Sequence, residues 1–587
     1  MLSQLKQTSG RLIQSSVHSE MFRYIAHIVL SIAVGLLAGA GGILFHSLLG
    51  FMGGLFEYGG LFVGSGWSEY LIILIPVAGA AVTSAMTFIA PEIAARRGVV
   101  SVIKAVIVRG GVIPLKETLF HLAAPIISIG TGLPLGPEGP SAKIGGGSGS
   151  LFAQVLKLGK RDTVMFTVAG AGAAISAVFN APIAGVFFGI EVVLQNDMRN
   201  RALSSLIIAS VVADILSRAV LGGGKAIVIP SYTLGGLEAY PFFLGLALFC
   251  GLAALVYFWL SNAFGRLYAD RLAKANPWLR LMPPALLFGL ALVKYPMLFG
   301  VGYDTISEVL AGGFGVADAA ALLALKLVFI ALLIKAGGYG GTFAPSMWLG
   351  AFVGFVFASL ANILFDVSIN TVAFALVGMG GMLAAVNSIP MTAIILVFEM
   401  TNDYRFVLPL MLVSIISYLV VIYAQKGTVY SQALSADGID LSIKSEMDIL
   451  GKIHVRSILR SDMETVDYRT PFRKLTDIII SSRYGDVVVV DGTGRLAGLI
   501  SIKDVRQALI DNDLADLLIA NDLVVHVPAV TEDAPLTAAI QRMDRNDIDI
   551  IPVTDEEGKF IGIITHGDII LSYEKMLGAV EDKESIM

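Results

Sequence analysis

The sequence predicts a polytopic α-helical membrane protein made of two homologous halves with broken helices, followed by a small α+β tail. Three observations support this fold class. Of 587 residues, 56% are hydrophobic and 15% are charged, which is unusual for a soluble domain. Charge is concentrated near the C-terminal end of the chain. Two internal repeats, described below, fall on either side of that change in composition.

Charge divides the chain near residue 430. Residues 21–430 carry 40 charged side chains, whereas the shorter stretch 431–587 carries 44, so a membrane domain precedes a soluble one. The net charge is +7 for residues 1–430 and −12 for residues 431–587. A positive membrane part suits anions better than cations, but the usual excess of Lys and Arg in cytoplasmic loops explains it equally well.

Apolar stretches long enough to cross a bilayer recur through the membrane part. They lie at about residues 24–51, 70–90, 119–135, 163–194, 203–222, 240–260, 282–300, 316–334, 343–364, 371–398 and 406–424. Gly and Pro interrupt the chain at 136–140, 180–182, 337–345 and 388–390. Because lipid offers no hydrogen bonds, such breaks survive only where protein covers them or where they line a watery cavity. We expect them to mark a permeation path.

An internal repeat joins these breaks in pairs. GPEGPSAKIGGGSG (136–149) aligns with GTFAPSMWLGAFVG (341–354) at an offset of 205, and residues 170–191 align with 378–399 at an offset of 208. Two blocks at nearly one offset predict a duplicated membrane domain. Paired broken helices indicate a binding site where the repeats meet, and helix N-termini bind anions through exposed N–H groups. Close helix packing explains a lone GxxxG pattern, but not Pro breaks that recur in register.

The tail repeats with a period of 64 residues. GLISIKD (498–504) matches GIITHGD (562–568), each after a β-rich run at 486–491 or 548–554. Amphipathic helix patterns lie upstream at 471–482 and 535–545. The pattern predicts two small α+β modules in tandem.

Glu138 is the first candidate functional residue. It lies between two glycines and two prolines in an interrupted membrane segment, where a charge is expensive to bury and by default functional. Surrounded by backbone N–H groups, it could fill an anion site as a carboxylate and leave when protonated or displaced. It would then be both gate and proton-binding group. A carboxylate that merely caps a helix is the alternative.

Other classes of function find little support in the sequence. The single cysteine, Cys250, lies in an apolar run, and the seven histidines have no metal-ligand spacing. GPEGPSAKIG lacks the GK[ST] ending of a phosphate loop. We therefore expect no enzyme, no metal, no required cofactor and no nucleic-acid partner. A divalent-cation transporter would need carboxylates along the pore, and the breaks present only Glu138.

Three segments resemble the CLC family of chloride channels and chloride/proton exchangers. GPEGP (136–140) looks like its G-[RK]-E-G-P segment, AVFNAPIAGVFFGIE (177–191) is similar to the signature that follows, and GGTFAPS (340–346) resembles its G-G-x-F-x-P segment. The resemblance covers residues 20–435. It implies inverted halves of broken and tilted helices, a homodimer and one anion pore per subunit. We expect a plasma (cell inner) membrane protein with cytoplasmic tail and N-terminal segment (1–20), and a membrane domain at 21–430.

Carried over by position, the resemblance makes Glu138 the gating glutamate. It places an anion among the Gly-rich break and the N–H groups of the matching break, with candidate anion-binding residues Gly136, Pro137, Gly139, Thr342 and Phe343. Tyr430, in TVYSQAL, takes the place of the family's tyrosine whose hydroxyl contacts the anion. An interfacial aromatic anchor is the alternative for Tyr430.

The chain departs from the family pattern in two places that bear on mechanism. Where the family has G-[SH]-G-[IV]-P, this chain reads RRGVV (96–100), so no side-chain anion ligand is transferred there, and Pro137 replaces a basic residue. Arg97 either points inward and adds positive potential near the anion, or it is an ordinary charge of a cytoplasmic loop. Lys143 and Lys335 could attract anions, extend their charged ends to the membrane surface, or pair with an acidic residue. Proton-coupled members commonly have a glutamate where this chain has Val192. That favours a gated chloride channel, with chloride/proton antiport as the alternative.

The tail modules resemble a pair of CBS domains at 450–578, after a linker at 431–449 and before a terminal segment at 579–587. Ser501 with Asp504, and Thr565 with Asp568, resemble the positions that hold the ribose of adenine nucleotides. A helix capping box gives the same pattern. We expect the modules to pair with each other and to regulate or stabilise the dimer. The expected partners are thus chloride or another small anion, membrane lipid, a second copy and an adenine nucleotide.

Overall fold

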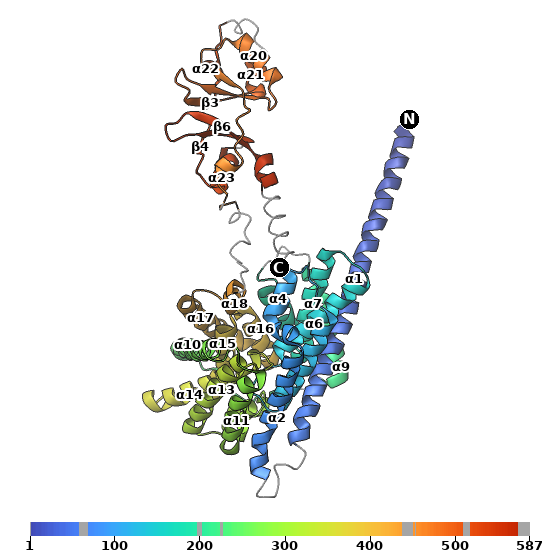
Figure 1. Cartoon of the computed structure of the whole chain (residues 1–587), viewed down its shortest axis with the longest axis vertical. Coiled ribbons are helices and arrows are strands. Elements are labelled where there is room, and N and C mark those ends of the chain that lie inside the picture. Colours follow the sequence, from blue (N-terminus) through green and yellow to red (C-terminus); the bar gives the residue numbers. More distant parts are fainter. Residues whose placement is uncertain are drawn as a thin grey trace. The chain divides into compact units, whose positions relative to one another are not determined.

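The computed structural model describes residues 2–57, 68–196, 202–222, 227–436, 450–451, 453–508, 517–546 and 548–572. The chain forms two compact units, Met1–Asp437 and Gly438–Met587. Figure 1 shows the first as a bundle of helices and the second as small sheets flanked by short helices. Residues 437–449 of the expected linker and the expected terminal segment 579–587 lie outside the described residues.

The first unit is helical in all of its described elements. Its α-helices are α1 (Leu2–Glu57), α2 (Ser68–Ile89), α3 (Pro91–Ala95), α4 (Gly98–Ile107), α5 (Leu115–Gly130), α6 (Glu138–Val155), α7 (Lys160–Phe179), α8 (Pro182–Phe188), α9 (Ala202–Leu221), α10 (Tyr240–Asp270), α11 (Pro277–Lys294), α12 (Tyr303–Leu310), α13 (Val316–Ala336), α14 (Phe343–Phe365), α15 (Thr371–Asn387), α16 (Pro390–Thr401), α17 (Val407–Gln425) and α18 (Val429–Ala436). A π-helical turn, η1 (Gly189–Val193), continues α8. Short 3-10 turns lie at η2 (Leu237–Ala239), η3 (Pro296–Leu298) and η4 (Tyr404–Phe406).

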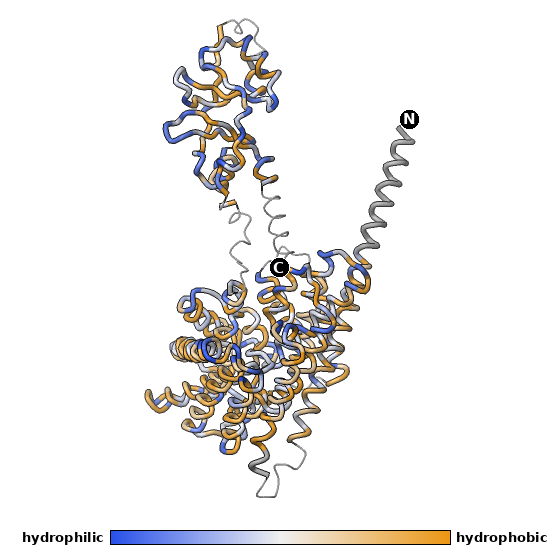
Figure 2. The backbone as a smooth tube through the Cα atoms, viewed as in Figure 1, coloured by the Kyte–Doolittle hydropathy of each residue, from blue (hydrophilic) through white to orange (hydrophobic). Residues whose placement is uncertain are grey.

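Among the described residues, eight helices are long and apolar enough to cross a membrane. Their outer faces carry large apolar side chains, and α10 shows this most clearly. Along it, Leu244, Leu248, Leu252, Val256 and Trp259 recur at helical spacing and are all exposed. Hydrophobic residues also dominate the helices in Figure 2. The protein is a multi-pass integral membrane protein whose exposed apolar stripes face hydrocarbon.

The predicted breaks divide two of the apolar stretches into separate helices. Asn180 and Ser388 end α7 and α15 in the left-handed conformation, with φ of 50° and 56°. Pro182 and Pro390 then begin α8 and α16, where a missing N–H costs nothing. Stretches 163–194 and 371–398 are therefore each two helices, and the breaks occur at matching positions of the two halves.

Glycines let the paired helices of each half approach closely. A Cβ on Gly145 of α6 would lie 2.2 Å from the carbonyl oxygen of Gly170 in α7. In the second half, a Cβ on Gly350 of α14 would lie 2.2 Å from the carbonyl oxygen of Gly378 in α15. These are the glycines that the repeat aligns, so each half uses the same backbone contact to fix its broken helices.

The second unit contains two three-stranded sheets with the strand orders β1-β2-β3 and β4-β5-β6. The strands are β1 (Thr465–Asp467), β2 (Asp486–Val490), β3 (Leu496–Ser501), β4 (Val530–Thr531), β5 (Ile550–Thr554) and β6 (Phe560–Thr565), with helices α20 (Phe472–Ser481), α21 (Ile502–Ala508), α22 (Ala520–Leu523) and α23 (Leu536–Asn546) and the 3-10 turn η6 (Val455–Ser457). In each sheet the first pair is parallel and the second antiparallel. The expected tandem α+β modules are confirmed.

The two modules exchange backbone segments along their sheets. Arg460, which lies in the first module ahead of β1, pairs with Ile563 of β6 through hydrogen bonds of 3.0 and 2.8 Å. Val525, which lies in the second module ahead of β4, pairs in the same way with Leu499 of β3 at 2.9 and 3.0 Å. The modules therefore pair with each other, because each covers a sheet edge of the other.

The glycine contacts predict where added side chains will not fit. Gly145→Val and Gly350→Val should each destabilise the membrane unit by about 1–3 kcal/mol or more, because the new atoms overlap backbone rather than flexible side chains. Gly50→Ala is the matched control, since a Cβ there meets nothing within 4 Å. Thermal unfolding of the purified protein measures the difference, and equal stability of Gly145→Val and Gly50→Ala would contradict this packing.

Candidate functional site

A pair of glycines from the two halves brings the matching breaks together. The N–H of Gly136 donates to the carbonyl of Gly341 at 2.8 Å, and the N–H of Gly341 donates back at 2.6 Å. Helix α6 begins two residues after Gly136, and α14 begins two residues after Gly341. A Cβ on Gly139 would lie 3.7 Å from Cα of Gly98, the first residue of α4. The N-termini of α4, α6 and α14 thus converge at one point inside the unit.

Glu138 fills that point. Its side chain is fully buried, and its Oε1 accepts a 2.7 Å hydrogen bond from the N–H of Ala344, in the first turn of α14. Its Oε2 has no hydrogen-bond partner among the described residues. The carboxylate therefore occupies the positive end of a helix in the other half, where a free anion would also be stabilised.

The donors around Glu138 only partly match those that the sequence suggests. The Gly136 N–H is used in the bridge to Gly341, and Pro137 has no N–H, so these two residues shape the site without offering an amide. Gly139 lies in the first turn of α6, where amides have no partner within the helix. The N–H of Ala344 donates to the carboxylate, and the N–H groups of the expected Phe343 and of Glu138 itself also act on it.

Side chains behind α14 hold its first turn in place. The Thr342 hydroxyl makes a short hydrogen bond to Oδ1 of Asn387, the last residue of α15, whose Nδ2 donates to Ser346 Oγ at 3.1 Å. The Phe343 ring is buried and meets Phe188 of α8 edge-on, with centroids 5.7 Å apart. Asn387 aligns with Phe179 in the repeat, so no shared motif marked it.

Two tyrosines approach Glu138 from other elements. Tyr430 of α18 is buried, and α18 packs against α4. The Tyr430 hydroxyl lies within electrostatic range of both Glu138 and Glu191. Tyr303, the first residue of α12, is also within range of Glu138. Tyr430 therefore lies near Glu138, and its expected contact with an anion stays a prediction, whereas nothing in the sequence distinguished Tyr303 from other aromatic residues.

Two further carboxylates cap helices across the halves. Glu191 accepts hydrogen bonds from the N–H groups of Met391 and Thr392 at 3.0 and 2.7 Å, and from the Thr392 hydroxyl at 2.6 Å. Its counterpart Glu399 accepts from the N–H groups at the start of α8, at 3.0 and 2.8 Å. Glu191 is almost entirely buried, and the neighbouring Val192 is fully buried. The repeat had aligned these glutamates but had not indicated that each caps the other half.

Lys143 forms an ion pair with Glu117, whereas Lys335 lies beside another helix, α10. Lys143 Nζ donates to the Arg96 carbonyl and Ser101 hydroxyl at 2.6 Å each, and to Glu117 at 3.1 Å. Glu117 also makes an ion pair with Arg96 and a longer one with Arg109. Lys335, near the end of α13, lies beside Gly265 of α10. Glu117 lies within a continuous helix, away from any break, so no sequence pattern singled it out.

In the tail, the Ser501 hydroxyl donates to Asp504 at 2.8 Å, and the Thr565 hydroxyl donates to Asp568 at 2.7 Å. Both pairs are therefore helix-capping contacts at strand ends. Arg460 Nε also donates to the second oxygen of Asp568 at 2.7 Å. Burial raises the pKa of Asp568, but the Thr565 hydroxyl and Arg460 outweigh it and lower that pKa below its usual value.

No group of His, Cys, Asp and Glu suited to a metal ion occurs among the described residues. The geometry instead brings helix N-termini and a buried carboxylate together in a membrane unit of two repeats, an arrangement that suits an anion.

Comparisons with known proteins identify the family of the membrane unit and of the tail modules. Residues 78–421 match the family described as voltage gated chloride channel, and residues 455–511 and 520–575 each match the CBS domain. The chain belongs to the CLC family of anion transport proteins and carries two CBS domains.

Some relatives are named as chloride channels and others as proton/chloride exchangers. Chloride channel protein CLC-f of Arabidopsis thaliana is 30% identical over 440 residues, which is 66% of this chain and 56% of the plant protein's length. The H(+)/Cl(-) exchange transporter ClcA of Vibrio cholerae is 33% identical over 318 residues, 52% of this chain and 67% of that protein.

Solved structures share the fold. A eukaryotic CLC transporter superposes with a TM-score of 0.63 at 17% identity, covering 93% of this chain and 98% of its own. A slow cyanobacterial Cl−/H+ antiporter gives 0.61 at 24% identity, covering 70% and 97%.

Proposed function

We propose that this protein exchanges chloride for protons, with Glu138 as the group that carries the proton past the anion site. The observation that carries this proposal is the fully buried Glu138 carboxylate on the Ala344 amide, at the N-terminus of α14. A carboxylate and a halide would compete for the same donors. Protonation removes the charge that holds the side chain there, so an anion enters as Glu138 takes up a proton. Because either the Glu138 carboxylate or a chloride ion occupies the site at one time, chloride movement is coupled to proton movement.

A second buried carboxylate offers the proton a route from the other side. Val192 cannot accept a proton, which by itself favours a gated channel. Glu191, beside it, is almost entirely buried. Tyr430 lies within electrostatic range of Glu191 and of Glu138. We therefore assign Glu191 the role of inner proton acceptor. The exchanger name of the Vibrio relative supports antiport, and the channel name of the plant relative supports the gated-channel alternative.

A flux measurement separates these two functions. Purified full-length protein is reconstituted into liposomes under a chloride gradient, and chloride and pH are recorded together. For an exchanger, the chloride gradient drives protons against their own gradient. If chloride moves without any proton movement, the protein is a channel and the antiport proposal is wrong.

Glu138→Gln should uncouple transport. The amide side chain mimics the protonated carboxyl group but cannot release a proton, so chloride flux should persist while proton flux falls to background. In the wild-type protein, lower pH should favour the protonated, displaced side chain and therefore faster anion entry, and this pH dependence should disappear in the variant. Proton flux that survives in Glu138→Gln would remove Glu138 from its assigned role.

Glu191→Gln should slow proton flux and leave chloride flux largely intact, because it removes the inner proton acceptor and keeps the shape of the side chain. Glu399→Gln is the matched control, since Glu399 makes the equivalent helix cap in the other half. If both variants lose proton flux alike, the effect comes from the caps rather than from proton transfer.

We further propose a homodimer in the plasma (cell inner) membrane with a cytoplasmic tail that binds adenine nucleotide at Ser501 and Asp504. Arg460 already engages Asp568, whereas Asp504 has no ion pair among the described residues, so Asp504 is the more available of the two carboxylates. Calorimetric titration of ATP into the full-length protein should show binding that Asp504→Asn weakens and Asp568→Asn leaves largely unchanged. Equal binding in both variants would contradict the assignment.

A further inference from the structure

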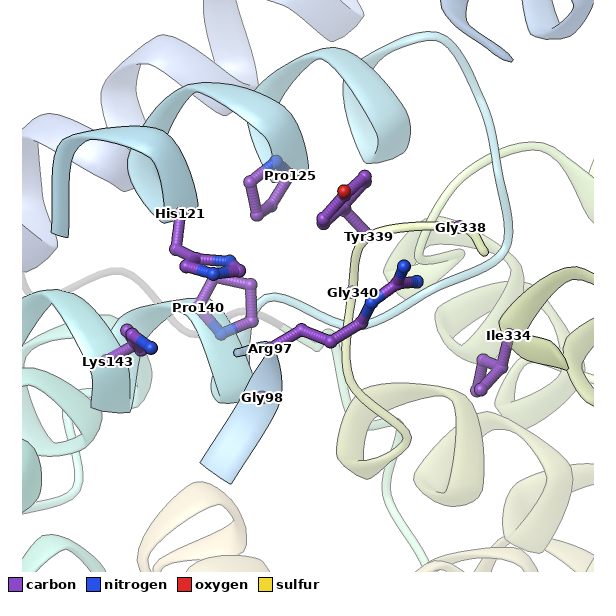
Figure 3. A pocket seen from close by; sticks show the side chains of 10 residues that line it. All are labelled: Arg97, Gly98, His121, Pro125, Pro140, Lys143, Ile334, Gly338, Tyr339 and Gly340. Atoms are coloured by element: carbon purple, nitrogen blue, oxygen red, sulfur yellow. The ribbon is translucent and has the colours of Figure 1, made fainter. Parts of the chain in front are cut away.

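A cavity of about 200 Å³ lies beside the converging helix N-termini. It is lined by Arg97, Gly98, His121, Pro125, Pro140, Lys143, Ile334, Gly338, Tyr339 and Gly340. Figure 3 shows the Arg97 side chain running across it from the start of α4, with His121 and Lys143 on one side and Tyr339 on the other. None of these lining residues carries a carboxylate. The cavity shares its wall with the gate, because Gly340 precedes the bridging Gly341 and Pro140 lies in the first turn of α6.

Arg97 presents unused donors in this space. Its Nε donates to the Ala94 carbonyl at 3.1 Å, and its guanidinium carbon lies 4.8 Å from the centroid of the Tyr339 ring. A Cβ on Gly337 would lie 3.7 and 3.9 Å from the two terminal nitrogens, which places them beside the loop before α14. Among the described residues, these terminal nitrogens have no hydrogen-bond acceptor. The planar group is therefore fixed at one edge and open at the other.

The charges around the cavity do not balance. The carboxylate that contacts the neighbouring cations is Glu117, and it is shared by Lys143, Arg96 and Arg109. No ion pair involves Arg97 in the part of the chain that the structure describes. A largely buried cation without a counter-charge is costly. A guanidinium is weakly hydrated and presents several donors in one plane, so a small anion can supply the missing charge at low desolvation cost.

We infer that this cavity binds a small monovalent inorganic anion, such as a halide, on the Arg97 guanidinium as a site separate from the one that Glu138 fills. Water takes up roughly 30 Å³ per molecule in the liquid, so the cavity can hold the anion with several waters. An anion held there raises the local anion concentration next to the gate. The inference rests on the proposed function only for this role beside the transport path, because binding itself requires neither transport nor proton coupling.

Bromide is the probe for this site, because it replaces chloride and scatters anomalously. In crystals of the full-length protein grown without chloride and soaked in bromide, an anomalous peak is expected against the Arg97 guanidinium. Calorimetric titration of bromide should show affinity at this site about tenfold or more weaker in Arg97→Gln, the consequence of losing one nearby charge. Arg97→Lys keeps the charge and should retain measurable binding. Arg96→Gln is the matched control, since it removes the adjacent charge without lining the cavity.

Two results would overturn the inference. One is unchanged bromide affinity in Arg97→Gln, and the other is wild-type crystals with bromide at the α14 N-terminus but none in the cavity. If Arg97→Gln does not fold because its contact with Tyr339 is structural, the wild-type bromide map still decides. The two proposals can fail separately. If bromide binding depends on Arg97 but no protons move in liposomes, only the antiport proposal is wrong. If flux is coupled to protons but no bromide binds in the cavity, only this site is wrong.

Discussion

The membrane unit depends on the reciprocal hydrogen bonds between Gly136 and Gly341. These bonds join two irregular segments that lipid could not satisfy, and in doing so they set the N-termini of α6 and α14 against each other. Only at such a junction can a carboxylate from one half reach an amide of the other, as Glu138 reaches Ala344. The site is therefore a property of the duplication rather than of either half.

The same principle of one half completing the other recurs around the site. Glu191 and Glu399 satisfy the first amides of α16 and α8, each in the opposite half. Aligned glycines at 145 and 350 allow the helix pairs to approach until backbone meets backbone. Unsatisfied amides inside a membrane cost several kcal/mol each, on the order of the stability of a whole small protein, so these cross-caps hold the breaks in place. The charges do not follow this principle, because Glu117 is shared by three cations of its own half while Arg97 faces a cavity.

Much of the fold could be read from sequence because its signals are local or repeated. Pro182 and Pro390 mark helix starts wherever they occur, and the offset between the two blocks identified the duplication before any contact was known. The two tail modules could likewise be predicted from their repeat period and from their β-rich runs. Within the site, the resemblance placed Glu138, Phe343 and Tyr430 in or beside the converging helix ends. It did not name Ala344, whose N–H follows that of Phe343 in the same first turn of α14 and also reaches the carboxylate.

The sequence by itself determined the membrane class, the duplication, the break positions and the paired tail modules, since hydropathy, proline and repeated spacing act on the chain locally. Tertiary structure alone decided which groups meet: Ala344 with Glu138, Glu117 with Lys143, Asn387 with Thr342 and Arg97 with Tyr339. Each of these pairs joins separate elements of the fold. Such contacts depend on how helices cross and how deep each side chain is buried, and no local pattern in the chain encodes either quantity.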